Sequence, residues 1–294
     1  MQNNYINFKK ERDFGSIISD TFTFIRYEYK AIFRLYLKHV GWALLLVLAT
    51  SAYYQYDSLR LSDDFSSSGG FNEYMINFLL QTSVSLLLLI VSSIVYSALS
   101  FTTINSIIKS YVTHEGEIKE DEVGKFVNQF FSTSLVGMLI FVVLVSIGIA
   151  LCILPGIYLA VPLILLFPII VFQEKTISEA FTECFQLIKQ NWWISFATLI
   201  VVSILISLIG GLFQIPIIVI SGLEALTSIE EGANGTGTQN LASNWLYMLL
   251  YILASLAQYI LGLVTLISVA FIYFNLNEYH NNTGTLEDID SIGS

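Results

Sequence analysis

The sequence predicts an all-α integral membrane protein whose six transmembrane helices form three hairpins, each preceded by an amphipathic helix at the cytoplasmic interface. Apolar residues make up 55% of the chain and charged residues only 12%, about half the charged share of a soluble globular domain. Residues 126–173 form a stretch of forty-eight positions without an Asp, Glu, Lys or Arg. The basic residues also fall almost entirely on one side of the predicted spans. Together these observations exclude a soluble protein.

The stretch 126–173 is too long for one membrane crossing, which takes about 20 residues. Pro155 and Gly156 lie in its middle and favour a tight turn. We therefore expect two spans, 132–153 and 157–172, joined by that turn.

Two further prolines, Pro162 and Pro168, lie inside the second of these spans. Each removes a backbone donor and kinks a helix. A membrane helix tolerates this when neighbouring groups bond the freed carbonyls.

The N-terminal part of the chain predicts the first hairpin. Residues 14–38 carry apolar side chains at helical spacing along one face, which favours a helix lying in the membrane interface. The first span is 40–56, with aromatic residues at both edges. A polar loop at 57–74 leads to the second span, 76–108, which is longer than a bilayer crossing and must tilt or project.

A charged connector, 109–125, precedes the second hairpin and is expected to be solvated. After that hairpin, Thr176 and Glu179 fit a capping box, so a helix should begin there. In residues 176–193 the apolar side chains recur every three to four positions, as in an amphipathic helix, and the polar side chains fall between them. The segment ends at two tryptophans.

The third hairpin follows. The fifth span is 194–222, a second polar loop covers 223–243, and the sixth span is 244–275. The remaining residues, 276–294, form a polar, acidic tail. We interpret the order of interfacial helix, span, outer turn and span as three parallel copies of one unit, which differs from inverted repeats.

The basic residues predict the orientation. Of thirteen Lys and Arg residues, all but Arg60 lie before the first span or in the connectors on the same side of the membrane. Such an excess marks the cytoplasmic side. We expect both termini and the amphipathic helices in the cytoplasm, in the cytoplasmic (inner) membrane of a bacterium.

The sequence predicts no catalytic, cofactor-binding or metal-binding residues. His39, His114 and His280 are far apart, and no zinc-type histidine spacing occurs. The interiors of the spans carry no charged residues, which argues against a proton-coupled pump. The expected partners are the lipid bilayer and other membrane proteins, and not nucleic acid.

Uncharged polar residues, glycines and prolines in or beside the spans are the remaining candidates for a functional or hinge role. One interpretation is hydrogen bonding and close packing between helices. The other is a break in the fifth span that lines a binding cavity. Glu174 either marks the interface or pairs with Lys175 or Lys189. The full set is Gln81, Pro155, Gly156, Pro162, Pro168, Glu174, Gly210, Gly211, Gln214, Pro216 and Gln258.

Residues 155–193, PGIYLAVPLILLFPIIVFQEKTISEAFTECFQLIKQNWW, resemble a pattern found in bacterial multi-pass proteins. These are proteins of the glycerophosphoryl diester phosphodiesterase membrane-domain type and the related YciC-like group. The resemblance implies a membrane domain without catalytic residues. The soluble phosphodiesterase barrel found in some members has no room in this chain.

Two functions follow as leading hypotheses, and an enzyme that acts on lipid comes third because no acid–base pair is visible. The first is a non-enzymatic multi-pass inner-membrane protein with an interaction or envelope-maintenance role. The alternative is a passive transporter or channel for a small or lipidic solute, which would use the segment 210–216 and the span glutamines. A polar cavity inside the bundle would favour transport, and a dry core would favour the first hypothesis.

Overall fold

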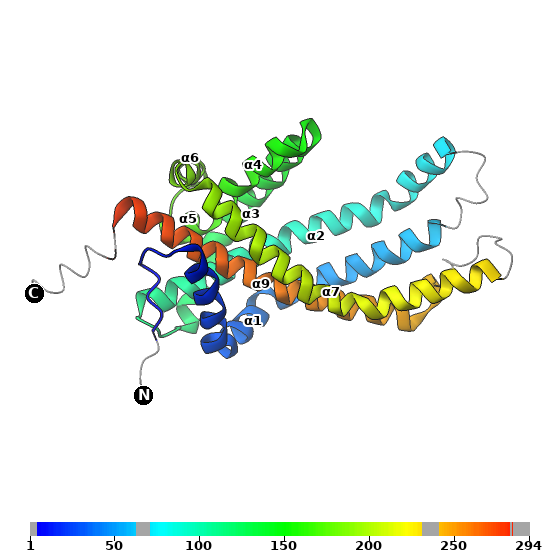
Figure 1. Ribbon diagram of the computed structural model, residues 1–294, viewed down its shortest axis with the longest axis horizontal. Helices are drawn as coiled ribbons and strands as arrows, with labels where there is room; N and C mark the ends of the chain where they lie inside the picture. Colours follow the sequence, from blue (N-terminus) through cyan, green and yellow to red (C-terminus); the bar gives the residue numbers. More distant parts are fainter. Residues whose placement is uncertain (1–4, 63–70, 231–240, 283, 285–294) are drawn as a thin grey trace, which may run out of the picture. The chain divides into compact units, whose positions relative to one another are not determined.

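The computed structural model describes residues 5–62, 71–230, 241–282 and 284, and this part of the chain is helical without a strand. Six of its helical segments are long and apolar enough to cross a membrane. The prediction of an all-α, multi-pass membrane protein is confirmed at this level (Figure 1). The helices are α1 (Phe14–Ser62), α2 (Phe71–Thr113), α3 (Glu120–Leu151), α4 (Ile153–Leu163), α5 (Leu166–Phe172), α6 (Ile177–Ile188), α7 (Trp192–Glu230) and α9 (Trp245–Asn281).

The helices divide between two compact units. Unit 1 contains Met1–Trp42, Ile94–Leu205 and Gly262–Ser294, and unit 2 contains Ala43–Ser93 and Ile206–Leu261. The helices α3, α4, α5 and α6 belong entirely to unit 1, whereas α1, α2, α7 and α9 each contribute a segment to both units.

The core of unit 1 is built around the C-terminal half of α2, where residues 98–108 are all buried. The Tyr36 hydroxyl of α1 lies 2.8 Å from both the Tyr96 hydroxyl and Ser100 Oγ of α2. The ring of Phe101 stacks on Phe167 of α5, with centroids 4.3 Å apart.

The polar residues of this buried α2 segment bond largely to their own helix. Thr102 and Ser106 each donate to the carbonyl four residues earlier, at 2.7 Å, and the Asn105 amide donates to the Phe101 carbonyl at 2.9 Å. A hydroxyl bonded in this way can be buried at little cost because its proton has a partner.

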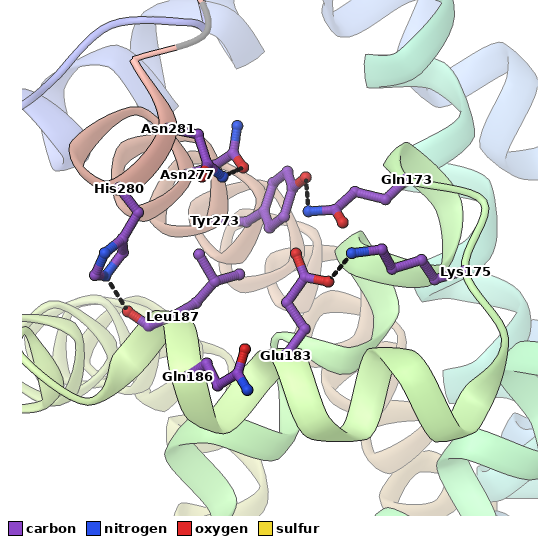
Figure 2. Close-up of a pocket in the computed structure, with 9 residues that line it drawn as sticks. All are labelled: Gln173, Lys175, Glu183, Gln186, Leu187, Tyr273, Asn277, His280 and Asn281. Atoms are coloured by element: carbon purple, nitrogen blue, oxygen red, sulfur yellow. Dashed lines mark hydrogen bonds and ion pairs between the residues drawn. The ribbon is translucent and has the colours of Figure 1, made fainter.

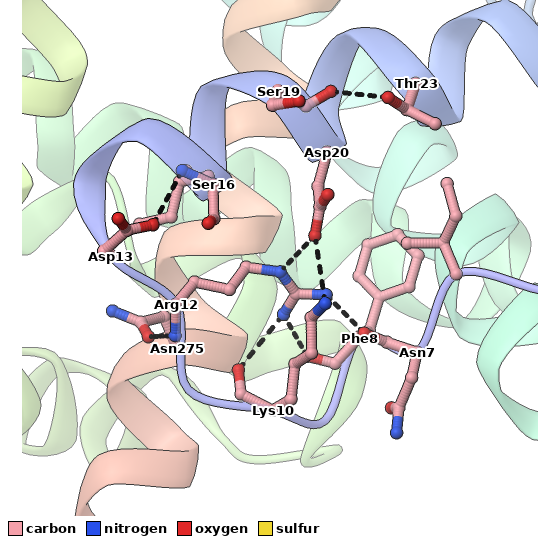
Figure 3. Close-up of polar contacts among 12 residues, drawn as sticks. Asn7, Phe8, Lys10, Arg12, Asp13, Ser16, Ser19, Asp20, Thr23 and Asn275 are labelled. Atoms are coloured by element: carbon pink, nitrogen blue, oxygen red, sulfur yellow. Dashed lines mark hydrogen bonds and ion pairs between the residues drawn. The ribbon is translucent and has the colours of Figure 1, made fainter.

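The N-terminal segment is anchored in unit 1 by Phe8 and Arg12. Phe8 is fully buried and stacks on Phe271 of α9 at 4.3 Å. The Arg12 guanidinium donates to Asp20 Oδ2 at 2.8 Å and to three backbone carbonyls of the preceding segment (Figure 3). The Arg12 backbone N–H donates to Asn275 Oδ1 of α9 at 2.6 Å. Burial lowers the pKa of Arg12, and the ion pair with Asp20 opposes that shift.

Unit 2 is held by polar contacts between helix pairs and a small apolar core. Ser85 of α2 donates to Asp57 of α1 at 2.7 Å, and Gln55 donates to the Tyr247 hydroxyl of α9 at 3.2 Å. One cluster of its buried apolar residues consists of Ile217, Leu241, Tyr247 and Ala254.

Apolar side chains also cover the outside of the helices. In α3, Val136, Leu139, Val143 and Ile147 recur at helical spacing and are about half exposed. The buried residues of α3 include Val127 on another face. A helix that is apolar on both its packed and its exposed face is typical of contact with lipid.

The turn predicted at Pro155-Gly156 lies elsewhere. The helix α3 ends at Leu151, Cys152 has an extended backbone, and α4 has begun by Ile153. Pro155 is the third residue of α4, where a missing N–H costs nothing because a helix start leaves its first N–H groups unpaired. Gly156 allows close packing of α4 on α3 and does not form the turn. A Cβ on the facing Gly148 would lie only 2.8 Å from the Gly156 Cα.

Several predicted boundaries also differ from the structure. The segments 14–38 and 40–56 form one continuous helix, α1, because no proline interrupts them. The span expected at 157–172 is divided into α4 and α5 at residues 164–165. The loops expected at 57–74 and 223–243 lie partly outside the described residues, and the tail lies largely outside them.

The fifth span is not broken. The helix α7 runs without interruption from Trp192 to Glu230, through Gly210, Gly211 and Pro216. The break proposed as the lining of a cavity is therefore wrong for this helix.

Candidate functional site

A polar pocket of about 590 Å³ in unit 1 is the best candidate for a functional site. It lies between the end of α5, one face of α6 and the last turns of α9 (Figure 2). The lining residues are Gln173, Lys175, Glu183, Gln186, Leu187, Tyr273, Asn277, His280 and Asn281.

The charged groups of the pocket form a pair. Lys175 Nζ, from the link between α5 and α6, bonds to Glu183 Oε2 on α6. Figure 2 shows the two side chains pointing toward one another at the wall of the pocket. The two opposite charges compensate one another at the wall of the pocket.

The helix α6 holds its pocket residues through a well-formed start. The predicted capping box is present: Thr176 N–H and hydroxyl both donate to Glu179 Oε2, at 3.0 and 2.7 Å. These hydrogen bonds hold the pKa of the Glu179 carboxyl below its usual range.

One face of α6 is buried against unit 1. It contains Ala180, Cys184, Leu187 and Ile188, at positions i, i+4, i+7 and i+8. Burial raises the pKa of the Cys184 thiol to about 12, so this cysteine stays protonated at neutral pH.

The last turns of α9 supply the opposite wall. Tyr273, Asn277, His280 and Asn281 recur at helical spacing and so share a face. Gln173 donates to the Tyr273 hydroxyl at 3.0 Å, and a ring nitrogen of His280 lies 3.1 Å from the Leu187 carbonyl. Gln186 is an exposed residue of the pocket lining.

Next to the pocket, Lys109 of α2 fixes the link that leaves α5. Its ammonium donates to the Val171 carbonyl and to Glu174 Oε1, both at 2.7 Å. The rings of Phe126 and Phe130 of α3 lie 4.8 and 4.9 Å from the same ammonium, within cation–π range. Glu174 therefore pairs with Lys109, and not with Lys175 or Lys189. Its backbone is left-handed, with φ at 55°, which is uncommon for a residue other than glycine.

A second hollow, of about 700 Å³, lies on the other side of α6. It is apolar and open, and is lined by Leu139, Ile140, Val143 and Leu144 of α3 and by Ile177, Ser178, Phe181 and Thr182. The helix α6 thus separates a polar pocket from an apolar groove.

The candidate residues from the sequence do not gather at one site. Pro155, Gly156, Pro162, Pro168 and Glu174 fall in unit 1, and Gly210, Gly211, Gln214, Pro216 and Gln258 fall in unit 2. The side chain of Gln81 lies outside the described residues.

Helix packing accounts for two of the unit 2 candidates. A Cβ on Gly210 would collide with Oε1 of Gln258, so the glycine makes room for the glutamine between α7 and α9. By contrast, a Cβ on Gly211 would meet no atom within 4 Å.

None of the residues that line the pocket was among the sequence candidates. The spacing of Tyr273, Asn277, His280 and Asn281 was a usable signal, since it places one polar face at the end of an apolar helix. Lys175 pairs with Glu183, and Lys109 pairs with Glu174. No local sequence pattern predicts either contact. Comparisons with protein-family models, curated proteins and solved structures find no match for the chain.

Proposed function

We propose that this chain is a non-enzymatic multi-pass protein of a bacterial inner membrane that binds polar lipid headgroups at the cytoplasmic ends of its helices. It would act in interaction with the lipid bilayer and with other membrane proteins, in an envelope-maintenance role. The resemblance of residues 155–193 to bacterial membrane domains supports the compartment, and the one-sided basic residues support cytoplasmic termini.

The observation that carries the proposal is the polar pocket beside α6. Its lysine is paired with Glu183, and the other polar groups are amides, a phenol and an imidazole. Such groups donate and accept hydrogen bonds in several directions, which suits the phosphate, amine or hydroxyl groups of a headgroup. The apolar groove on the other face of α6 provides a surface that suits an acyl chain.

The proposed placement of α6 at the membrane interface agrees with its two faces. Its exposed residues include Ser178, Glu179, Thr182 and Gln186, opposite the buried apolar face. Two tryptophans follow at the start of α7, as is common where a helix enters the headgroup region.

Lipid retention tests the proposal. The wild-type protein and the double variant Gln186→Leu/Asn281→Leu would be purified in mild detergent, and bound lipid would be measured by native mass spectrometry. We expect the double variant to lose most of the retained lipid, because two hydrogen-bonding amides of the pocket are replaced. The control is Gln190→Leu, an exposed residue outside the pocket lining. Equal retention by the double variant and the control would contradict headgroup binding here.

Transport has its own test. The wild-type protein in liposomes should show no solute flux above empty liposomes. Gln214 lies half-buried in the unbroken α7 and is the residue to replace. A measurable flux that is lost in Gln214→Leu would favour the passive transporter and defeat the proposed role.

A further inference from the structure

The point where α3 meets α4, the apex, is apolar and exposed. Leu151, Ile153 and Leu154 are 80%, 66% and 74% exposed, and Cys152 between them is exposed as well. No charged residue occurs from 126 to 173. A helical tip with this composition has its free energy minimum in hydrocarbon, because each of these side chains would otherwise face water.

The backbone of the apex is compact enough for such a setting. Cys152 N–H donates to the Gly148 carbonyl at 3.0 Å, and Pro155 has no N–H to satisfy. Gly148 and Gly156 bring the two helix backbones into direct contact. The hydrogen bond of Cys152 and the missing N–H of Pro155 reduce the number of backbone groups at the apex that need a partner, as a setting at membrane depth requires.

A contact within unit 1 fixes how deep the apex can lie. The ring of Tyr158 in α4 stacks on Trp192 with centroids 5.4 Å apart, and the Trp192 indole N–H donates to the Tyr158 carbonyl at 3.4 Å. Trp192 is the first residue of α7 and of its apolar span, directly after α6 and the charged Lys189. It therefore marks the membrane boundary at which that span begins.

Tyr158 is six residues from Cys152, which corresponds to about 9 Å along a helix. The hydrocarbon core is about 30 Å thick. An apex this close to the boundary at Trp192 cannot also reach the opposite face of the bilayer.

We propose that α3 and α4 form a re-entrant hairpin whose apex is embedded among the acyl chains of the leaflet next to α6. The hairpin enters and leaves on the same side and does not cross. The crossing helices are α1, α2, α7 and α9, and segments of these four helices make up unit 2. This replaces the water-exposed outer turn expected for the second hairpin.

Cys152 provides a native probe of the apex. In the Cys184→Ala background of the full-length protein, a membrane-impermeant maleimide would be applied to spheroplasts and to inverted membrane vesicles. We expect Cys152 to react about tenfold more slowly than the controls in both preparations, because a membrane-impermeant reagent does not enter the hydrocarbon around the apex. It should react fully after denaturation in SDS.

The controls are single cysteines placed at two exposed positions in a variant from which both native cysteines have been removed. Arg60→Cys reports the outer side and Gln190→Cys the inner side. Reaction of Cys152 from outside at the rate of Arg60→Cys would show a crossing hairpin and overturn the proposal. Reaction from inside at the rate of Gln190→Cys would place the apex in water and overturn it as well.

A nitroxide label on Cys152 separates lipid from protein as the cover. In proteoliposomes, the label should collide more often with molecular oxygen, which partitions into hydrocarbon, than with a water-soluble nickel chelate. More frequent collisions with the nickel chelate would contradict an embedded apex. Low collision rates with both reagents would mean that protein covers the apex, and this too would overturn the proposal.

Discussion

At the scale of single residues, two glycines of this chain make opposite predictions for the same substitution. Gly156→Ala would place a Cβ 2.8 Å from the Ile149 backbone N, so α3 and α4 must separate, whereas Gly211→Ala has open space. We expect Gly156→Ala to destabilise the fold by about 1–3 kcal/mol. Gly211→Ala should be neutral or stabilise by up to about 1 kcal/mol, because alanine favours helix. Thermal unfolding in detergent measures both, and equal melting temperatures would contradict the close contact.

Replacing Arg12 should lower the free energy of unfolding. Replacing it in Arg12→Gln removes the charged donor shared by Asp20 and three carbonyls. We expect a loss of about 2–3 kcal/mol in the free energy of unfolding, because buried acceptors lose their partners. The control Arg26→Gln changes an exposed arginine and should stay within about 0.5 kcal/mol. Denaturant unfolding in detergent gives both values, and comparable losses would refute a structural role for Arg12.

The reactivity of Cys184 toward alkylating reagents should depend on pH. Because burial raises the pKa of the Cys184 thiol to about 12, the reactive thiolate is scarce at pH 8 and increases as the pH approaches that value. In Cys152→Ala, we expect Cys184 to resist alkylation at pH 8 in the folded protein and to react after unfolding. Rapid alkylation of the folded variant at pH 8 would mean that the α6 face opens.

At the scale of elements, the proline in α4 makes a prediction that couples two helices. Because Pro162 has no N–H, the Tyr158 carbonyl lacks its helical partner, and it accepts a hydrogen bond from the Trp192 indole instead. Trp192→Phe keeps a ring but removes this donor, so we expect a loss of about 1 kcal/mol.

The double variant Pro162→Ala/Trp192→Phe supplies the control. An alanine N–H at position 162 can donate to the Tyr158 carbonyl, so the effect of Trp192→Phe should be smaller in this background. A double-mutant cycle from thermal unfolding measures the coupling. Additive effects would mean that the indole does not serve the freed carbonyl.

Local patterns predicted helices more reliably than the joints between them. The capping box at Thr176 and Glu179 was confirmed because its signal lies within one turn of helix. The turn assigned to Pro155 and Gly156 was wrong because both residue types also suit a helix start and a close helix contact. Neither lysine considered as a partner of Glu174 pairs with it, because Lys109, which does, lies far away in sequence and is brought near only by packing.

At the scale of the whole molecule, the basic residues predict a topology that reporter fusions can measure. Twelve of the thirteen Lys and Arg residues lie on one predicted side, and Arg60 lies on the other. We expect reporters fused at Ser294 and within 109–125 to be cytoplasmic, and a reporter within 232–238, outside the described residues, to be external. A cytoplasmic signal at 232–238 would contradict the orientation of α7 and α9.

The membrane class and the order of the helices could be predicted because both depend on composition summed over long segments. The polar pocket could not, since its walls come from α5, α6 and α9, and no local pattern states which helix ends meet. The sequence also could not predict that α1, α2, α7 and α9 each contribute to two units, because each is a continuous helix with no break at the boundary between the units.

The aromatic contact between Phe8 and Phe271 has a consequence for how the protein is made. Phe8 is synthesised long before the ring that stacks on it, because Phe271 belongs to α9. The Arg12 backbone N–H likewise has its acceptor, Asn275 Oδ1, only after α9 has been synthesised. The core of unit 1 around Phe8 therefore cannot close before α9 has been synthesised, and the segment that carries Phe8 and Arg12 must stay undocked until then.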